Sequence, residues 1–333
     1  MIDQLNIYGM TKLEVSIERI KQIEPRGGSW YLAFSGGKDS CVIKALCDMA
    51  GVKYDAHYRV SSVDPPELVR FIREKHPDVE FEFPRYKDGR VVTMWNLIPT
   101  KTMPPTRLVR YCCQYLKENG GEGRDKITGV RWDESVRRRK KRSGLEVEDK
   151  RDRTKLDPDN MDEEMVRFCM QSKGFILNPI IDWTTDEVWE FIHRYEIPYC
   201  ELYDQGFKRL GCIGCPMATP KEKEREFKRY PKYKEAYIRA FDRMIQHQIE
   251  GGCSRATDGR TLQMVGGIPQ KEQNSSTYRY GYEFKNGKEF VEAWSKFRGG
   301  VMPNPHKPNI ETGKKHIFGG QANKYNERRA DET

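Results

Sequence analysis

A short apolar run that leads directly into a glycine-rich turn constrains the fold of this chain more than any other feature. Residues 30–34 read WYLAF, residues 35–40 read SGGKDS, and apolar residues then recur at helical spacing at Val42, Ile43 and Leu46. The apolar run is typical of a buried strand, and the change of period indicates a helix directly after the turn. The sequence therefore predicts a strand, a tight turn and a helix in immediate succession.

The turn carries the residue types that bind an anion. Two glycines allow positive φ and a close approach of the backbone to a ligand. The N–H groups at the start of the following helix are donors, as are two hydroxyls and an ammonium group. These residues are Ser35, Gly36, Gly37, Lys38, Asp39 and Ser40. The G-x-x-x-x-G-K-[ST] spacing of a Walker A loop is absent. We predict a phosphate-binding turn, with an ordinary glycine turn as the alternative.

Strand and helix patterns alternate over the following part of the chain. Further strands are predicted at 54–60, 79–83, 126–130 and 175–180, with helices that begin at Pro65-Pro66 and at Thr185 or Asp186. This alternation favours an α/β fold with a doubly wound, mostly parallel sheet. Ligands of such sheets bind beyond the carboxyl ends of the strands, where the glycine turn is expected to lie.

Four regions are expected along the chain. Residues 1–28 contain a helix that begins at a Thr11–Glu14 capping box, and residues 29–220 form the nucleotide-binding domain. Residues 221–298 form a helical, highly charged extension. Residues 299–333 are rich in Pro, Gly, Asn and Lys and are predicted to be an extended or disordered tail.

Three segments resemble the adenine-nucleotide alpha-hydrolase superfamily, which includes ATP pyrophosphatases and the phosphoadenylyl-sulfate (PAPS) and adenylyl-sulfate (APS) reductases. The turn SGGKDS is similar to the pyrophosphate-binding loop of that superfamily. GVRWDES at 129–135, followed by Arg138, resembles its G-x-R-x-x-E-S-x-x-R segment, and NPIIDW at 178–183, continued by DEVW at 186–189, resembles its P-I-x-D-W stretch. The resemblance covers roughly residues 30–217 and is specific to the PAPS-reductase-like branch.

The resemblance implies a set of site residues and ligands. ATP or a related adenine nucleotide is expected to bind through Ser35, Gly36, Gly37, Lys38, Asp39, Ser40, Arg131, Ser135 and Arg138. The expected catalytic residues are Lys38, Asp39, Arg131 and Glu134. Guanidinium groups at 131 and 138 suit phosphate or sulfate, and the carboxylate of Glu134 can orient an arginine or help to hold Mg²⁺. Without the resemblance, a solvated charged loop explains residues 129–138 equally well.

The cysteines require an explanation other than disulfides. The chain has nine, and its start MIDQLNIYGMTK lacks the regions of a signal peptide, so a reducing cytoplasmic location is expected. Cys112-Cys113 and the C-x-x-C of Cys212 and Cys215 supply four thiols, which suit an iron–sulfur cluster or zinc; a C-x-x-C by itself also suits a redox pair. The resemblance implies a [4Fe–4S] cluster on these four. Cys41, Cys47, Cys169 and Cys200 have apolar neighbours typical of core residues.

Three departures separate this chain from the sulfonucleotide reductases that it resembles. No cysteine follows Cys253, although those reductases carry a nucleophilic cysteine in a C-terminal tail. Leu116-Lys117 stands where the cluster-bearing reductases have Arg-Lys, and the SGGKDS loop is intact. These departures favour an ATP pyrophosphatase that works in sulfur transfer. The alternatives are a PAPS or APS reductase that uses Cys253, and a non-catalytic nucleotide- or redox-sensing regulator that binds DNA.

Charge bears on the acceptor of such a transfer. The net charge is +9, and its densest part is Arg137, Arg138, Arg139, Lys140, Lys141 and Arg142. The run follows the expected nucleotide site, so a nucleic-acid acceptor contacted through its phosphates is a hypothesis, with a solvated charged face as the alternative. A cysteine desulfurase or another sulfur donor is an expected partner. No apolar run approaches the roughly 18 residues of a membrane span, so no membrane is expected.

Overall fold

The chain forms two compact units in the computed structural model. The structure describes residues 2, 3, 5, 6, 9–25, 28–148, 153–160, 174–249, 264, 265, 268, 269 and 286–296. Unit 1 consists of Met1–Val91 and Tyr115–Gly211, and unit 2 of Val92–Gln114 and Cys212–Thr333. This division differs from the expected boundaries at 28 and 220, because the N-terminal helix packs within unit 1 and an internal segment joins the C-terminal helices. The expected tail lies outside the described residues.

Unit 1 is built on a seven-stranded sheet with the order β3-β2-β1-β4-β7-β5-β6. The first five strands in this order are parallel: β3 (Glu80–Glu82), β2 (Tyr54–Arg59), β1 (Trp30–Ala33), β4 (Lys126–Ile127) and β7 (Phe175–Leu177). The mostly parallel α/β fold that the alternation predicts is thus confirmed. An antiparallel hairpin, β5 (Leu145–Glu148) and β6 (Arg153–Leu156), extends one edge and was not predicted.

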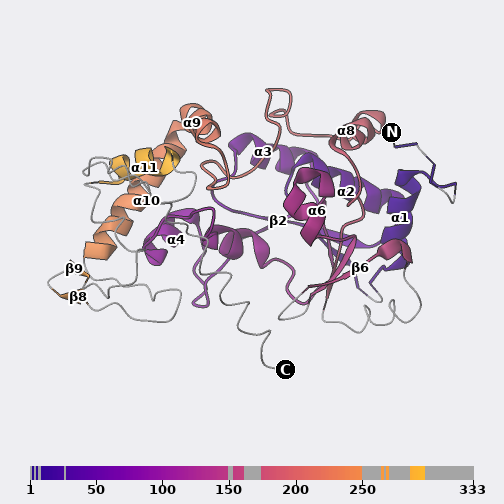
Figure 1. Cartoon of the computed structure of the whole chain (residues 1–333), viewed down its shortest axis with the longest axis horizontal. Coiled ribbons are helices and arrows are strands. Elements are labelled where there is room, and N and C mark those ends of the chain that lie inside the picture. Colours follow the sequence, from indigo (N-terminus) through magenta and orange to yellow (C-terminus); the bar gives the residue numbers. More distant parts are fainter. Residues whose placement is uncertain are drawn as a thin grey trace, which may run out of the picture. The chain divides into compact units, whose positions relative to one another are not determined.

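Four of the five helices described in unit 1 lie where the sequence predicts them, and the helix over Val136–Lys141 was not predicted. The five helices are α1 (Lys12–Gln22), α2 (Lys38–Ala50), α3 (Pro66–Lys75), α6 (Val136–Lys141) and α8 (Thr185–Arg194), with short 3₁₀ turns at η2 (Trp132–Glu134) and η3 (Pro158–Asn160). The predicted capping box of Thr11 and Glu14 begins α1. Figure 1 shows α2 between α1 and α3. The core places Trp30 of β1 edge-on against Phe175 of β7, with ring centroids 5.3 Å apart.

Unit 2 is helical and joins two distant parts of the chain. It contains α4 (Met94–Lys101), α5 (Tyr111–Cys113), α9 (Pro220–Arg229), α10 (Pro231–Ile249) and α11 (Gly287–Lys296), with a short β8–β9 pair (Met264–Val265 and Ile268–Pro269). A π-helix, η1 (Gln114–Glu118), continues α5. Helix α10 packs against α4, α9 and α11, and Figure 1 shows α4 among the C-terminal helices. None of the described helices has the length and apolar character that a membrane crossing requires.

Candidate nucleotide site and cysteine cluster

The glycine turn lies between β1 and α2, at the carboxyl end of the central strand. Gly36 has φ of +70°, and a Cβ there would lie 2.8 Å from side-chain carbons of Leu68 and Ile72. A left-handed conformation without room for a side chain requires glycine. Gly37 is extended and forms the N-cap of α2, so α2 has no side-chain cap of its own. The turn therefore brings the backbone close to α3 and offers no side-chain cap to the first N–H groups of α2.

Two serine hydroxyls hold the turn in this shape. Ser40 Oγ donates to the carbonyl of Gly37 at 2.8 Å and accepts from the backbone N–H of Ser35 at 3.2 Å. It also lies 3.2 Å from Ser35 Oγ, which accepts weakly from the N–H of Gly37 at 3.4 Å. These bonds link the two ends of the turn, so its conformation is formed before any ligand arrives.

The charged residues of the turn form a chain of ion pairs. The ammonium of Lys38 lies 3.2 Å from one carboxylate oxygen of Asp39, and the other oxygen accepts from Nε of Arg131 at 2.7 Å. Lys38 is 8% exposed in its side chain and Asp39 is 23% exposed. The Lys38 ammonium and the Asp39 carboxylate thus lie at the turn, and ion pairs hold both groups in place.

Arg131 supports Asp39 from below the surface. Its side chain is only 1% exposed, and Nη1 donates to the carbonyl of Trp183 at 3.2 Å and lies 3.4 Å from Asp133. A Cβ at Gly129 would lie 3.0 Å from the backbone of Asp39, so the two segments approach closely. The structure therefore places Arg131 as a buried anchor, whereas we expected it to face the nucleotide.

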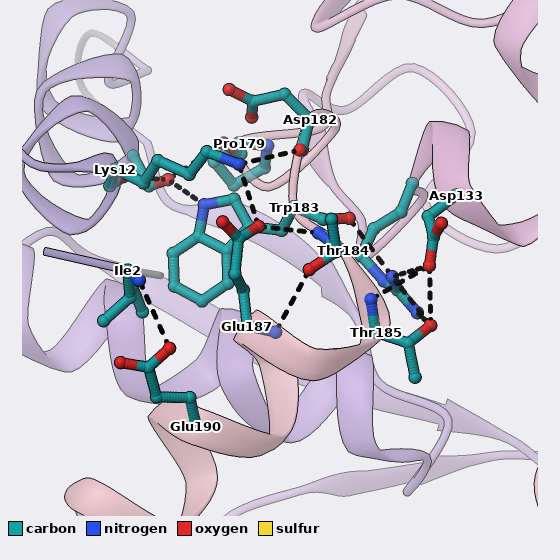
Figure 2. Close-up of polar contacts among 12 residues, drawn as sticks. Ile2, Lys12, Asp133, Pro179, Asp182, Trp183, Thr184, Thr185, Glu187 and Glu190 are labelled. Carbon is teal, nitrogen blue, oxygen red and sulfur yellow. Dashed lines mark hydrogen bonds and ion pairs between the residues drawn. The ribbon is translucent and has the colours of Figure 1, made fainter. Parts of the chain in front are cut away.

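The start of α8 contacts Asp133, which in turn lies next to Arg131. Asp133 accepts from the backbone N–H of Thr185 at 2.9 Å and from its hydroxyl at 2.7 Å, as Figure 2 shows. Trp183 is fully buried and donates from its indole N–H to Ser16, which joins the segment to α1. Lys12 completes this contact with an ion pair to Glu187 at 2.8 Å. The stretch at 178–189 thus positions the site rather than entering it.

Glu134, Ser135 and Arg138 form the outer part of the site. A carboxylate oxygen of Glu134 pairs with the guanidinium of Arg138 and accepts from the backbone N–H of Arg131 at 3.2 Å. Ser135 caps α6 by accepting from the N–H of Arg138 at 3.2 Å. Burial lowers the pKa of Arg138, the neighbouring cations Arg209 and Arg142 lower it further, and Glu134 opposes them. Glu134 thus contacts both Arg138 and the backbone of Arg131.

Two residues that the sequence did not single out lie at this site. The hydroxyl of Tyr203 accepts from the backbone N–H of Lys38 at 3.0 Å, across a separation of 165 residues. Arg209 is exposed and within electrostatic range of Arg138. The pair Lys208-Arg209, just before the C-x-x-C motif, was a usable signal for a second basic segment. No local pattern marks Tyr203, because its partner lies in another part of the sequence.

The basic run forms a short helix. Val136–Lys141 is helical, and four of the six cations, Arg137, Arg139, Lys140 and Lys141, are exposed. The other two have acidic partners, because Arg138 pairs with Glu134 and Arg142 Nε lies 2.6 Å from the buried Glu146. The helix therefore presents four exposed cations whose charge is not neutralised by Glu134 or Glu146, because these two carboxylates pair with Arg138 and Arg142.

The structure brings the four predicted cysteine ligands together within unit 2. A hydrogen bond to Cys113 is the main cause that raises the pKa of Cys112, followed by burial and by the neighbouring Cys212 and Cys215. Tyr237 is fully buried in this region, where burial and the nearby thiols raise its pKa. Segments about a hundred residues apart in sequence thus meet in one unit, as a shared cluster requires.

The C-x-x-C loop is held by α9 and α10. Tyr237 donates to the carbonyl of Ile213 at 2.9 Å, and Glu226 accepts from the N–H of Gly214 at 2.7 Å. Gly214 has φ of +69°, and a Cβ would lie 2.9 Å from Phe227. The ammonium of the buried Lys223 lies 4.9 Å from the ring centroid of Trp294, and the Cys215 thiol acts to raise the pKa of Lys223 against the larger effect of burial. The loop is thus fixed beside a buried cation.

The cysteines among the described residues divide between unit 2 and the core of unit 1. Among the residues that the structure describes, no three His, Cys, Asp or Glu side chains are arranged to hold one metal ion. The [4Fe–4S] cluster that the resemblance implies would take one thiolate on each of four iron atoms. Cys41, Cys47 and Cys200 are buried core residues, as predicted. Cys169 and Cys253 lie outside the described residues.

Comparison with known proteins gives one family match. The family model described as "Phosphoadenosine phosphosulfate reductase domain" matches residues 29–218. The match includes the glycine turn, the segment 129–138, the stretch 178–189 and both cysteine motifs.

Curated relatives match shorter parts. The chain is 44% identical over 73 residues to an adenosine 5'-phosphosulfate reductase of Oceanobacillus iheyensis, covering 22% of this chain and 28% of the relative. It is 32% identical over 89 residues to one of Salinibacter ruber, covering 27% of each protein. An uncharacterized protein of Methanocaldococcus jannaschii is 25% identical over 211 residues, or 60% of this chain and 39% of that protein. The chain thus spans less than half the length of each of these relatives.

Among solved structures, the phosphate complex of phosphoadenylyl-sulfate reductase from Candida auris is similar with a TM-score of 0.40 and 16% identity. The similarity covers 63% of this chain and 92% of that one. A likeness of this size does not bear on the site.

Proposed function

Because the chain belongs to the phosphoadenosine phosphosulfate reductase domain family, we propose that it binds an adenine nucleotide and acts in sulfur transfer as an ATP pyrophosphatase. ATP adenylylates an acceptor oxygen and pyrophosphate leaves; sulfur that a thiol reductant has brought to the level of sulfide then bonds to the activated carbon or phosphorus, and AMP leaves with the acceptor oxygen. The observation that carries this proposal is the intact SGGKDS turn, which is preformed by its serines and has Lys38 fixed beside it. Relatives named adenosine 5'-phosphosulfate reductase support a function related to sulfonucleotides.

In this proposal the turn stabilises the charge that develops on the departing pyrophosphate. The first N–H groups of α2 and the ammonium of Lys38 are donors fixed in advance, which is the arrangement that lowers a barrier of this kind. Arg131 keeps Asp39 in place through one ion pair, and Glu134 holds the guanidinium of Arg138 through another. Mg²⁺ bound with the nucleotide would neutralise phosphate charge, and the partly exposed carboxylate of Asp39 is the group that we expect to hold it.

We assign the four thiols of Cys112, Cys113, Cys212 and Cys215 to a [4Fe–4S] cluster. Their meeting in unit 2 supports this assignment, and the fixed C-x-x-C loop supplies a rigid half of the ligand set. When bound, the cluster would supply electrons or a site for sulfur. A cysteine desulfurase or another donor would provide that sulfur.

The exposed cations of α6 support a polyanionic acceptor such as nucleic acid. Arg137, Arg139, Lys140 and Lys141 are exposed on one short helix that directly follows Glu134 and Ser135. Phosphate contacts by such cations weaken as salt increases. Replacing these four residues with glutamine is expected to weaken DNA or RNA binding and to make the slope of log K against log salt shallower by as much as about 3–4 units. An unchanged slope would remove nucleic acid from the proposal.

The decisive experiment is anaerobic purification followed by parallel assays for pyrophosphate release from ATP and sulfite release from PAPS. The variant Lys38→Met should lose pyrophosphate release. Lys44→Met is the matched control, because Lys44 lies on the same helix α2 and pairs with Asp78 at 3.0 Å, away from the turn. Equal loss in both variants would show that helix stability, and not the turn ammonium, explains the effect.

A second candidate is a sulfonucleotide reductase, which the names of the relatives favour. Sulfite release from PAPS or APS that depends on thioredoxin and disappears in Cys253→Ala would establish it. Nucleotide binding without either product, with several acceptors tested, would instead indicate a sensor that uses its basic surface to bind DNA.

A further inference from the structure

Helix α2 lacks the side-chain cap that α1 and α8 of unit 1 have. The first N–H groups of any helix have no partner within the helix, and a Ser, Thr, Asp or Asn side chain before the helix usually satisfies one of them. Thr11 does this for α1 and Thr184 for α8. Gly37 precedes α2 and has no side chain to offer. The N–H of Lys38, the first residue of α2, is one of the groups that the helix itself leaves without a partner.

Tyr203 provides this partner. Its hydroxyl oxygen accepts from the backbone N–H of Lys38 at 3.0 Å, and it lies 3.5 Å from the Cβ position of Gly37. The ammonium of Lys38 lies 5.9 Å from the centroid of the same ring. The hydroxyl thus stands at the start of α2, beside the ammonium, where the proposed function places a phosphate oxygen.

The ring of Tyr203 is held by neighbouring aromatics. Trp189 of α8 packs edge-on with ring centroids 5.1 Å apart, and Tyr199 lies 6.5 Å away. Burial raises the pKa of Tyr203, so the phenol stays neutral. A neutral hydroxyl is a weaker acceptor than a charged phosphate oxygen for an N–H at a helix start.

We propose that Tyr203 is a built-in cap of α2 that occupies a phosphate position in the free protein and is displaced when pyrophosphate or the β,γ-phosphates of ATP bind. This inference rests on the proposed function of the turn. One N–H makes one strong hydrogen bond, so a phosphate oxygen that takes the N–H of Lys38 replaces the hydroxyl. The loss of the cap is then a cost that binding must offset, and the cap keeps α2 ordered when no nucleotide is present.

The test compares Tyr203→Phe with the wild type in the full-length protein, by calorimetric titration of inorganic pyrophosphate with Mg²⁺. The ring is retained, and only the competing hydroxyl is removed. A neutral hydrogen bond of ordinary strength corresponds to an increase in pyrophosphate affinity of roughly 2- to 12-fold. The midpoint of thermal unfolding without pyrophosphate should fall in the same variant. Weaker or unchanged pyrophosphate binding would overturn the inference.

Tyr199→Phe is the matched control. Tyr199 belongs to the same aromatic group, with its ring centroid 5.3 Å from that of Trp189. Its hydroxyl, however, donates to Asp204 at 3.1 Å and does not reach the turn. Its removal should leave pyrophosphate affinity unchanged, and a gain equal to that of Tyr203→Phe would overturn the inference.

A second measurement needs no change at Tyr203. Displacement of the hydroxyl moves the ring against Trp189, so pyrophosphate should change a tryptophan fluorescence signal that is absent in Trp189→Phe. Binding to the wild type without this signal would also overturn the inference. If neither the wild type nor Tyr203→Phe binds pyrophosphate or ATP, the proposed function of the turn fails together with it, an outcome distinct from equal binding by both proteins.

Discussion

Replacement of Gly36 with alanine is expected to be among the most disruptive single-methyl changes in unit 1. The residue has φ of +70°, which costs an alanine about 1–2 kcal/mol. The new Cβ would also lie 2.8 Å from Cδ1 and Cγ1 of Ile72 and from Cδ1 of Leu68. Both side chains are buried in the core, so they cannot move into solvent, and overpacking of this kind costs about 1–3 kcal/mol. The sum is a destabilisation of about 2–5 kcal/mol.

Gly51→Ala separates the two contributions. Gly51 ends the same helix α2 with φ of +69°, and a Cβ there would meet nothing within 4 Å. This control should therefore cost only the conformational share, about 1–2 kcal/mol. Urea unfolding followed by circular dichroism gives the shift in midpoint for each variant, and titration with pyrophosphate measures whether the turn still binds its expected ligand. A midpoint shift for Gly36→Ala no larger than that for Gly51→Ala would refute the argument that α3 leaves no room at the turn.

Three further predictions concern residues around the two sites. Burial lowers the pKa of His76 to about 4 from 6.5, so the unfolded chain binds a proton at a higher pH than the folded protein does. The free energy of unfolding should therefore fall by about 2–3 kcal/mol as the pH decreases from 6.5 toward 4. His76→Phe should make the urea midpoint depend less on pH over this range, and a pH dependence equal to that of the wild type would contradict the assignment. Arg131→Met leaves Asp39 and the carbonyl of Trp183 without their partner and should cost about 2–4 kcal/mol in thermal or urea unfolding, where a cost below about 1 kcal/mol would show that the anchor is dispensable. Cys215→Ser should abolish iron retention and the visible absorption of anaerobically purified protein, while Cys200→Ser, a buried core change in unit 1, should retain both; a full iron content in Cys215→Ser would exclude it as a ligand.

The local elements, and the chemical groups that they carry, could be predicted from the amino-acid sequence alone. The strand, the glycine turn and helix α2 follow from apolar spacing and from glycine over some twenty residues, and the Thr11 and Glu14 capping box needs only four. The family was likewise predictable, because motif residues are identified by type and spacing, whereas the four cysteine ligands stay a prediction. These features depend on interactions between near neighbours, which a sequence displays directly.

Packing between distant segments determined which of these groups are buried and which partners they have. Arg131 was expected at the nucleotide but is buried against Asp39, 92 residues away, because α8 and Trp183 close over it. Tyr203 caps α2 through a hydrogen bond between residues 165 positions apart in the sequence. The β5–β6 hairpin pairs with β7 at the edge of the parallel strands. Such contacts depend on packing between distant segments. Spacing along the chain therefore predicts which residues carry groups suited to binding or catalysis. The packed fold determines which of them are buried as supports of the site and which remain at its surface.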